Sequence, residues 1–272
     1  MIDIGQDQAL YLFYVSGAEF AGDGQALEIN PPLSLFAHRY ADLVCVLGIV
    51  PIAEFCGAEA ERNLGELKWV GERAMRHQRV IEQGFARGPV LPARFGTLFS
   101  SIPALERFIE TNRHPIGDFL ERVQGHEEWG VKALLKRAAA KEWLRSQLAP
   151  AGKDALVSPG LRYIQERRAE AAADKQLQRW LEEACESIAE SLDRYAIDRR
   201  QGRILDAGLE DSGELVLNLA ALIPHGRRQD LIAHLANLNA ERAEQGLSFI
   251  PNGPWPPYSF CPPLVTPPLL TP

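Results

Sequence analysis

The order of apolar segments in residues 127–250 constrains the fold more than any other feature of the sequence. A short strand pattern comes first, followed by a long helical pattern, two strands, a second helix and a last strand. In chain order the ranges are 129–135, 161–195, 202–207, 214–222, 227–244 and 247–250. This order is that of the split βαβ arrangement, so we expect a ferredoxin-like (βαββαβ) domain here.

The long helical pattern at 161–195 carries apolar residues at near-heptad spacing in its second half. These residues are Leu177, Leu181, Ala184, Ile188, Leu192 and Tyr195. At 1.5 Å per residue the helix would reach ~50 Å, which is longer than a small domain requires. We therefore expect it to pack on a neighbour or to lie across both domains.

The first half of the chain has a mixed α and β pattern. Strands are predicted at 9–15, 33–37, 43–50 and within 89–99, and helices at 59–85 and 105–123. In the first helix, apolar positions recur at spacings of three and four, which predicts one buried face. These positions are Leu67, Val70, Ala74, His77 and Ile81. Ser101 is placed to cap the second helix.

The length of 272 residues favours two domains, because one domain usually takes roughly 100–200 residues. We place an N-terminal α+β domain at 1–125 and the ferredoxin-like domain at 126–252. A Pro- and aromatic-rich tail follows at 253–272. Residues 251–272 hold nine of the nineteen prolines, so we expect extended chain there, neither helix nor central strand. Beyond Cys261 no aromatic residue anchors the tail, so we expect mobility.

Charge and hydropathy exclude two classes of partner. The net charge is −7 and no basic stripe is visible, so we expect no nucleic-acid binding. The N-terminus lacks a basic n-region, and the longest apolar run, 43–53, is about half of the ~20 residues that a membrane-spanning helix needs. We expect a soluble, cytoplasmic protein with no membrane partner. The four cysteines form no C-x-x-C pair, which indicates reduced thiols and no metal site.

No motif for a catalytic, cofactor-binding or metal-binding site is present, so the sequence predicts no enzyme and no cofactor. His77 lies on an apolar helix face, where a core histidine bonded to a backbone carbonyl is favoured over a catalytic one. Arg94 could clamp an anion or pair with a carboxylate of the preceding helix, and we favour the structural pair. A concave, basic pocket around Arg94 would support the anion clamp.

Four short segments carry a resemblance, at 67–81, 89–99, 128–132 and 253–260. The residues that we single out as family or structural positions are Trp69, His77, Pro92, Arg94, Phe95, Gly96, Thr97, Trp129, Gly130, Lys132, Gly253, Trp255, Pro256, Pro257, Tyr258 and Phe260. In their order and spacing, these segments resemble the gas vesicle proteins of the GvpF/GvpL family. That family often has His-Glu where this chain has His77-Gln78, which removes one charge.

The resemblance implies an accessory protein that helps to build the hollow, gas-filled shell of gas vesicles. It implies contacts with GvpA, the small and very apolar main shell protein, and with other accessory Gvp proteins. It also implies a two-domain α/β fold with ferredoxin-like character and a location in the cytoplasm at the gas vesicle. Two alternatives stay open: a scaffold that only joins accessory proteins, and an enzyme on a ferredoxin-like scaffold such as a cofactor-independent oxygenase.

Overall fold

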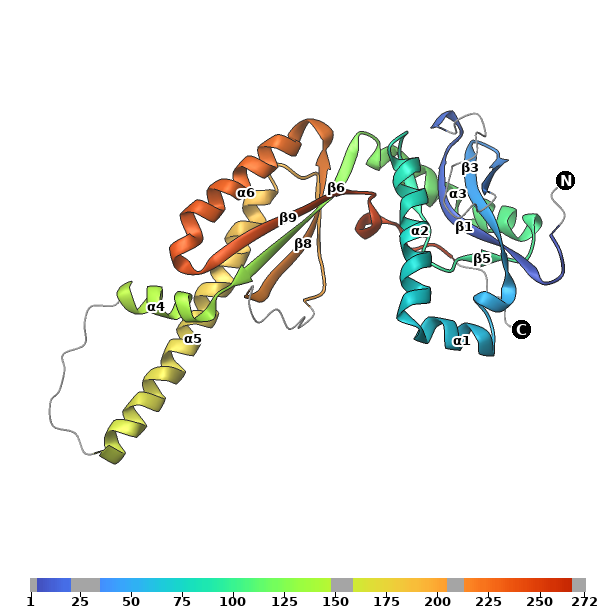
Figure 1. Cartoon of the computed structure of the whole chain (residues 1–272). Helices are drawn as coiled ribbons and strands as arrows, with labels where there is room; N and C mark the ends of the chain where they lie inside the picture. The colour runs from blue at the N-terminus through green and yellow to red at the C-terminus, as the bar shows by residue number, and fades with distance from the viewer. Residues whose placement is uncertain (1–3, 21–34, 148–158, 205–212, 266–272) are drawn as a thin grey trace. The chain divides into compact units, whose positions relative to one another are not determined.

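The structure is a computed structural model that describes residues 4–20, 35–147, 159–204 and 213–265 (Figure 1). These residues contain both helices and two β-sheets, so the predicted α+β class is confirmed. The chain forms two compact units. The first is Met1–Glu127 together with Trp255–Pro272, and the second is Glu128–Pro254.

The first unit is built on a sheet of order β2-β3-β1-β4, in which β5 also pairs with β1. All of these pairs are antiparallel. The elements of this unit are β1 (Gln8–Gly17), β2 (Leu35–Tyr40), β3 (Leu43–Pro51), α1 (Ala58–Gly65), α2 (Leu67–Phe85), β4 (Val90–Pro92), β5 (Leu98–Phe99) and α3 (Ile102–Val123).

Strand β1 is the centre of this unit, because helices cover both faces of the sheet around it. All of its residues after Gln8 are buried. Leu98 of β5 packs into the core cluster that contains Val80 and Ile81 of α2, whereas the ring of its neighbour Phe99 contacts Phe108 of α3. Adjacent strand residues point to opposite faces, so α2 and α3 cover opposite faces of the sheet.

Three sequence predictions for this unit need comment. The capping of α3 is confirmed, because the Ser101 side chain accepts a hydrogen bond from the Ala104 amide. The single helix at 59–85 is wrong, since Glu66 has extended φ and ψ angles and separates α1 from α2. The apolar face of α2 is also shorter than predicted: Leu67 is 90% exposed, whereas His77 and Ile81 are buried.

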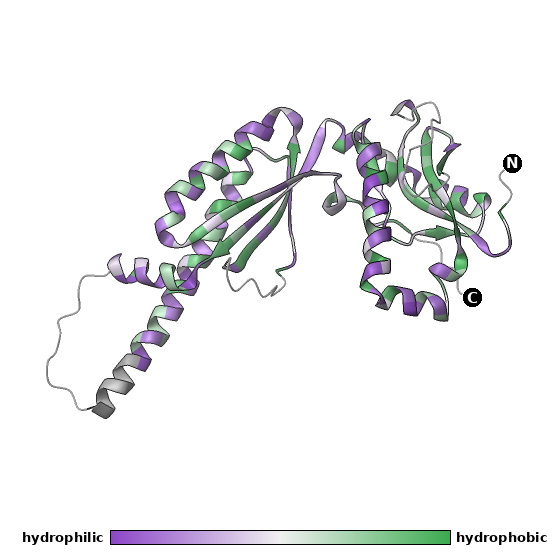
Figure 2. Cartoon of the chain, viewed as in Figure 1, coloured by the Kyte–Doolittle hydropathy of each residue, from purple (hydrophilic) through white to green (hydrophobic). Residues whose placement is uncertain are grey.

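The second unit has a sheet of order β7-β8-β6-β9. Its elements are β6 (His126–Leu135), α4 (Arg137–Gln147), α5 (Pro159–Leu192), β7 (Asp198–Gln201), β8 (Glu214–Pro224), α6 (Arg228–Arg242) and β9 (Leu247–Trp255). Alternate residues of β6 and β8 pack with the apolar residues of α5 and α6 in one core. In Figure 2 the strands carry green stretches, and the helices carry green and purple residues together, as amphipathic helices do.

The near-heptad residues of α5 face this core, as their spacing predicts. Leu177, Ile188 and Leu192 are at most 1% exposed, and Leu181 and Ala184 are also buried. Toward the start of α5, Arg167 to Ala172 are all exposed. The second half of α5 therefore stabilises the unit, and the exposed stretch before it adds little apolar burial.

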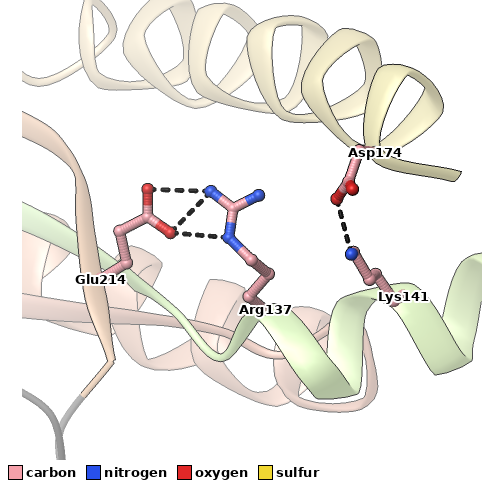
Figure 3. Close-up of polar contacts among 4 residues, drawn as sticks. All are labelled: Arg137, Lys141, Asp174 and Glu214. Carbon is pink, nitrogen blue, oxygen red and sulfur yellow. Dashed lines mark hydrogen bonds and ion pairs between the residues drawn. The ribbon is translucent and has the colours of Figure 1, made fainter. Parts of the chain in front are cut away.

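Helix α4 was missed by the sequence prediction. It buries only Ala140 and Leu144, so its apolar face is narrow. Polar contacts help to attach it, as Figure 3 shows: Arg137 makes a bidentate pair with Glu214 of β8, and Lys141 lies 2.6 Å from Asp174 of α5. A ring contact between Trp143 and Trp180 adds apolar packing.

Two strand predictions in this unit differ from the structure. The strand predicted at 202–207 is wrong: β7 lies at Asp198–Gln201, residues 202–204 are not in a strand, and 205–212 lie outside the described residues. The last strand was predicted to end at Ile250, but β9 continues through two prolines to Trp255. Proline is tolerated in β9 because this strand is at the edge of the sheet.

Within the described ranges, no helix is both long and apolar enough to cross a bilayer. The four cysteines are free thiols. Burial raises the pKa of the Cys45 thiol to about 12, so this side chain is protonated at neutral pH.

Candidate functional site

Three of the four sequence segments that carry the family resemblance meet at one cleft in the first unit. The cleft has a volume of about 790 Å³ and is lined by parts of β1, α2, β4, α3 and the C-terminal segment. Six of the residues that we singled out from the sequence line it: His77, Pro92, Arg94, Phe95, Thr97 and Tyr258. The structure therefore brings residues from three distant parts of the chain to one surface.

A chain of hydrogen bonds holds His77 beneath this cleft. Nε2 of His77 lies 3.1 Å from the carbonyl oxygen of Ala93, and Nδ1 lies 3.0 Å from the hydroxyl of Tyr11. The Gly96 amide donates to the same hydroxyl at 3.0 Å. A carbonyl oxygen can only accept, so Nε2 carries the proton and the Tyr11 hydroxyl donates to Nδ1. The predicted bond between His77 and a backbone carbonyl is confirmed.

Burial keeps both side chains of this pair neutral. It lowers the pKa of His77 to about 4, although the Ala93 carbonyl acts in the opposite direction. It raises the pKa of Tyr11, against a smaller lowering by the Gly96 amide. Neither group therefore titrates near pH 7, and the pair is suited to positioning the segment at 93–96 rather than to proton transfer.

The residues Arg94–Thr97 form a turn next to the hydrogen bonds of Tyr11 and His77. The Arg94 carbonyl accepts from the Thr97 amide at 3.1 Å and from the Thr97 hydroxyl at 2.7 Å. Gly96 has φ +80°, which favours glycine at the third position of the turn. Thr97 and Gly96 therefore fix the backbone, and the Arg94 side chain is exposed.

The carboxylate partner that we predicted for Arg94 is wrong. Among the residues that the structure describes, no hydrogen bond or ion pair of the Arg94 side chain is formed. It lines the cleft as a charged group beside mostly apolar residues, and the described residues of the lining include no carboxylate. A cleft with this lining would attract an apolar group that carries a negative charge.

The C-terminal segment forms one wall of the cleft. The Tyr258 hydroxyl donates to Oε1 of Gln78 at 2.6 Å, and Phe260 is 3% exposed. Val265 makes two backbone hydrogen bonds with the buried Asn112 side chain, at 2.8 and 3.0 Å. The expected mobility after Cys261 is therefore wrong for residues 262–265, and 266–272 lie outside the described residues.

Two residues of this site were missed in the sequence. The hydroxyl of Tyr11 gave no signal, because a tyrosine in an apolar strand pattern is common. Asn112 could have been found: it is a single amide at helical spacing from Leu105, Phe108, Ile109 and Ile116, all of which are buried.

The other residues that we singled out from the sequence lie outside the cleft lining. Trp69 contacts the ring of Phe55 and stacks under the Arg73 guanidinium, and Pro256 and Pro257 are buried. Gly130 and the exposed Lys132 are in β6, and Trp255 ends β9.

Gly253 lies against the core residue Trp129. A Cβ atom on Gly253 would be 3.0 Å from that ring and 2.9 Å from the Glu128 carbonyl oxygen. The close approach of β9 to β6 therefore explains glycine at this position, which is outside the cleft.

Comparison with known proteins identifies relatives along most of the chain. The chain is 31% identical over 233 residues to gas vesicle protein L of Streptomyces sp. (strain CB03234), covering 85% of this chain and 83% of that protein. It is 29% identical over 193 residues to gas vesicle protein F of the same strain, covering 68% of this chain and 76% of that one.

Solved structures share the fold. The crystal structure of gas vesicle protein GvpF from Anabaena sp. PCC7120 superposes with a TM-score of 0.66 at 14% identity, covering 94% of this chain and 96% of that one. GvpF from Microcystis aeruginosa gives 0.66 at 15% identity, covering 93% and 99%.

The family model of the gas vesicle synthesis protein GvpL/GvpF matches residues 10–262. This range includes nearly all of both sheets, most of the cleft lining and the residues that hold His77. The resemblance noted in the sequence is confirmed, and the chain belongs to the GvpL/GvpF family of gas vesicle proteins.

Proposed function

We propose that this chain is an accessory protein for gas vesicle formation, acting as an assembly factor or as a minor structural component. The observation that carries this proposal is the GvpL/GvpF family match over residues 10–262. In the proposal, its partners are the main shell protein GvpA and other accessory Gvp proteins, and it works in the cytoplasm at the gas vesicle.

The cleft of the first unit is the surface that we propose for the contact with GvpA. Its walls are mainly apolar, and among the lining residues that the structure describes, Arg94 is the one arginine, is exposed and has no carboxylate beside it. An apolar shell subunit must be shielded until it joins the wall, and a cleft of this kind could cover one apolar segment beside an acidic residue. A scaffold that joins accessory proteins would use the same kind of contact.

The two compact units support a two-domain organisation with a ferredoxin-like second domain. The strand order β7-β8-β6-β9, with helices between β6 and β7 and between β8 and β9, is consistent with that arrangement.

The enzyme alternative lacks support in the cleft. General acid–base chemistry needs titratable groups with pKa values near the working pH. The pKa of His77 is about 4, both of its ring nitrogens are hydrogen-bonded, and no carboxylate is among the described residues that line the cleft.

A strain lacking this gene tests the proposal. We expect loss of the light scattering that disappears under a pressure pulse, and its return when the wild-type gene is supplied. Scattering unchanged by the deletion would count against a required accessory role.

Arg94→Glu tests the cleft. This side chain is exposed and forms no hydrogen bond or ion pair with the described residues, so we expect the variant to fold. We expect weaker co-purification of GvpA and poor complementation. Arg79→Glu is the matched control, since Arg79 is an exposed arginine outside the cleft lining. Equal behaviour of the two variants would remove Arg94 from the contact.

A further inference from the structure

A second, smaller cavity lies in the first unit between β1, β3 and α2. Its volume is about 110 Å³. Five aromatic rings line it: those of Tyr11, Phe13, Phe55, His77 and Phe95. It shares His77 and Phe95 with the larger cleft, and its other lining residues are different.

The wall of this aromatic pocket is held in place before any ligand arrives. Phe13 stacks on His77 with 5.6 Å between ring centroids, and Phe55 contacts both Tyr11 and Phe95. The polar atoms of Tyr11 and His77 are used in the hydrogen bonds described above. The rings therefore present apolar surface, and little order has to be gained on binding.

The volume limits what the pocket can hold. An apolar cavity of about 150 Å³ accommodates a benzene molecule, and drug-sized ligands take ≈300–1,000 Å³. A cavity of about 110 Å³ therefore matches one apolar side chain, such as leucine, and is too small for a whole cofactor.

The charges at the pocket favour a negative group beside that side chain. Arg73 is neutralised by Glu54, with nitrogen–oxygen distances of 2.7 and 3.0 Å, and its guanidinium also stacks on Trp69. Arg76 lines the same pocket, and in the described parts of the chain its side chain forms no ion pair or hydrogen bond. With Glu54 paired to Arg73, the positive charge of Arg76 has no counter-ion among the residues that the structure describes.

We propose that this aromatic pocket binds a leucine-sized apolar side chain of a partner protein, with an adjacent carboxylate of that partner pairing with Arg76. The rings remove the side chain from water, and the arginine selects segments in which an acidic residue is adjacent to the apolar one. The proposal rests on the pocket alone and does not depend on the role in gas vesicles.

Three blocked dipeptides test it with the purified full chain: acetyl-Leu-Glu-amide, acetyl-Leu-Gln-amide and acetyl-Ala-Glu-amide. Saturation-transfer NMR and titration give the affinities. We expect the Leu-Glu peptide to bind about five- to tenfold more tightly than Leu-Gln, as a partly exposed charge-assisted contact allows, and Ala-Glu to show no saturation.

Variants locate the site. Arg76→Gln should reduce Leu-Glu binding to the Leu-Gln level, and Arg79→Gln, one turn along α2 and outside the pocket lining, should leave the ratio unchanged. Val50→Phe should fill the pocket and abolish binding of both leucine peptides. If Val50→Phe does not fold, the comparison of the two arginine variants still decides.

The proposal would be overturned if neither leucine peptide bound to the wild-type chain at about 10 mM peptide. This concentration is of the order that weak contacts require. Equal affinity for Leu-Glu and Leu-Gln would overturn the role of Arg76. A failure of the gene deletion to affect gas vesicles would leave these measurements untouched, so the two proposals fail separately.

Discussion

The hydroxyl of Tyr11 and Nδ1 of His77 lie 3.0 Å apart, and together they join β1 to α2 and to the turn that projects Arg94. Tyr11→Phe removes the shared hydroxyl and leaves the Gly96 amide and the His77 nitrogen without this partner. We expect a loss of about 1–3 kcal/mol in the free energy of unfolding. Urea unfolding measures it, and an unchanged midpoint would contradict the assigned hydrogen-bond chain.

Stability should depend on pH through His77. Its pKa falls from 6.5 to about 4 on folding, so the folded protein disfavours the charged form. The stability is complete above pH 6.5 and is lost as the pH falls toward 4, by up to about 3 kcal/mol.

His77→Gln cannot titrate, so this part of the pH dependence should vanish in the variant. Urea unfolding at pH 7.5, 6 and 5 compares the two proteins. Parallel pH profiles for wild type and variant would show that His77 is not the group responsible.

Two glycines of α2 should respond oppositely to alanine. A Cβ atom on Gly84 would lie 2.4 Å from the ring of Tyr14, whereas a Cβ on Gly71 meets nothing within 4 Å. Gly71→Ala should stabilise the protein by about 0.5–1 kcal/mol, because alanine favours helix. Gly84→Ala should destabilise it by about 1–3 kcal/mol, because α2 or Tyr14 must shift. Thermal unfolding of both variants tests the pair, and stabilisation by both would place α2 farther from β1.

Asn112 should control the order of the C-terminal wall of the cleft. Asn112→Ala removes both hydrogen bonds to Val265, so we expect faster hydrogen exchange at the Val265 amide and a loss of about 1–3 kcal/mol. Asn239→Ala is a matched control, since Asn239 makes the same two kinds of bond with Phe249 in the second unit. Exchange at Val265 should not change in that control.

Leu67 and Ile81 occupy the two ends of the predicted apolar face of α2, yet only one is buried. Leu67→Ser should change stability by less than about 0.5 kcal/mol, because the side chain is 90% exposed. Ile81→Ala should cost about 2–5 kcal/mol, because Ile81 is fully buried. Comparable losses for both would mean that the start of α2 is covered.

Periodicity predicted the elements that bury a continuous apolar face. The second half of α5 and the β6, β8 and α6 segments were found because their buried residues follow regular spacing. Helix α4 was missed because it buries two residues and depends on ion pairs with elements that are distant in the sequence. Strand β7 contains only polar residues and forms by pairing with β8, a contact that local pattern does not show.

The candidate site could be predicted in part. A histidine on an apolar helix face predicts a hydrogen-bonded core residue, and His77 is one. The prediction of a carboxylate partner for Arg94 was wrong, because a sequence does not show whether an arginine beside a turn points inward or outward. The convergence of α2, β4 and residues 258–264 depends on the tertiary fold, which brings the end of the chain back to its beginning.

That return has a consequence for biosynthesis. The first unit includes residues from both ends of the chain, and the second unit is continuous in sequence. On the ribosome, the second unit can therefore be completed while the first still lacks Tyr258, Phe260 and Val265. N-terminal domains usually fold first during synthesis. Here the N-terminal unit can complete its fold after the C-terminal residues have been synthesised. A chain stopped at residue 254 would emerge without the C-terminal wall of the cleft, and its Asn112 side chain would lack both hydrogen bonds to Val265.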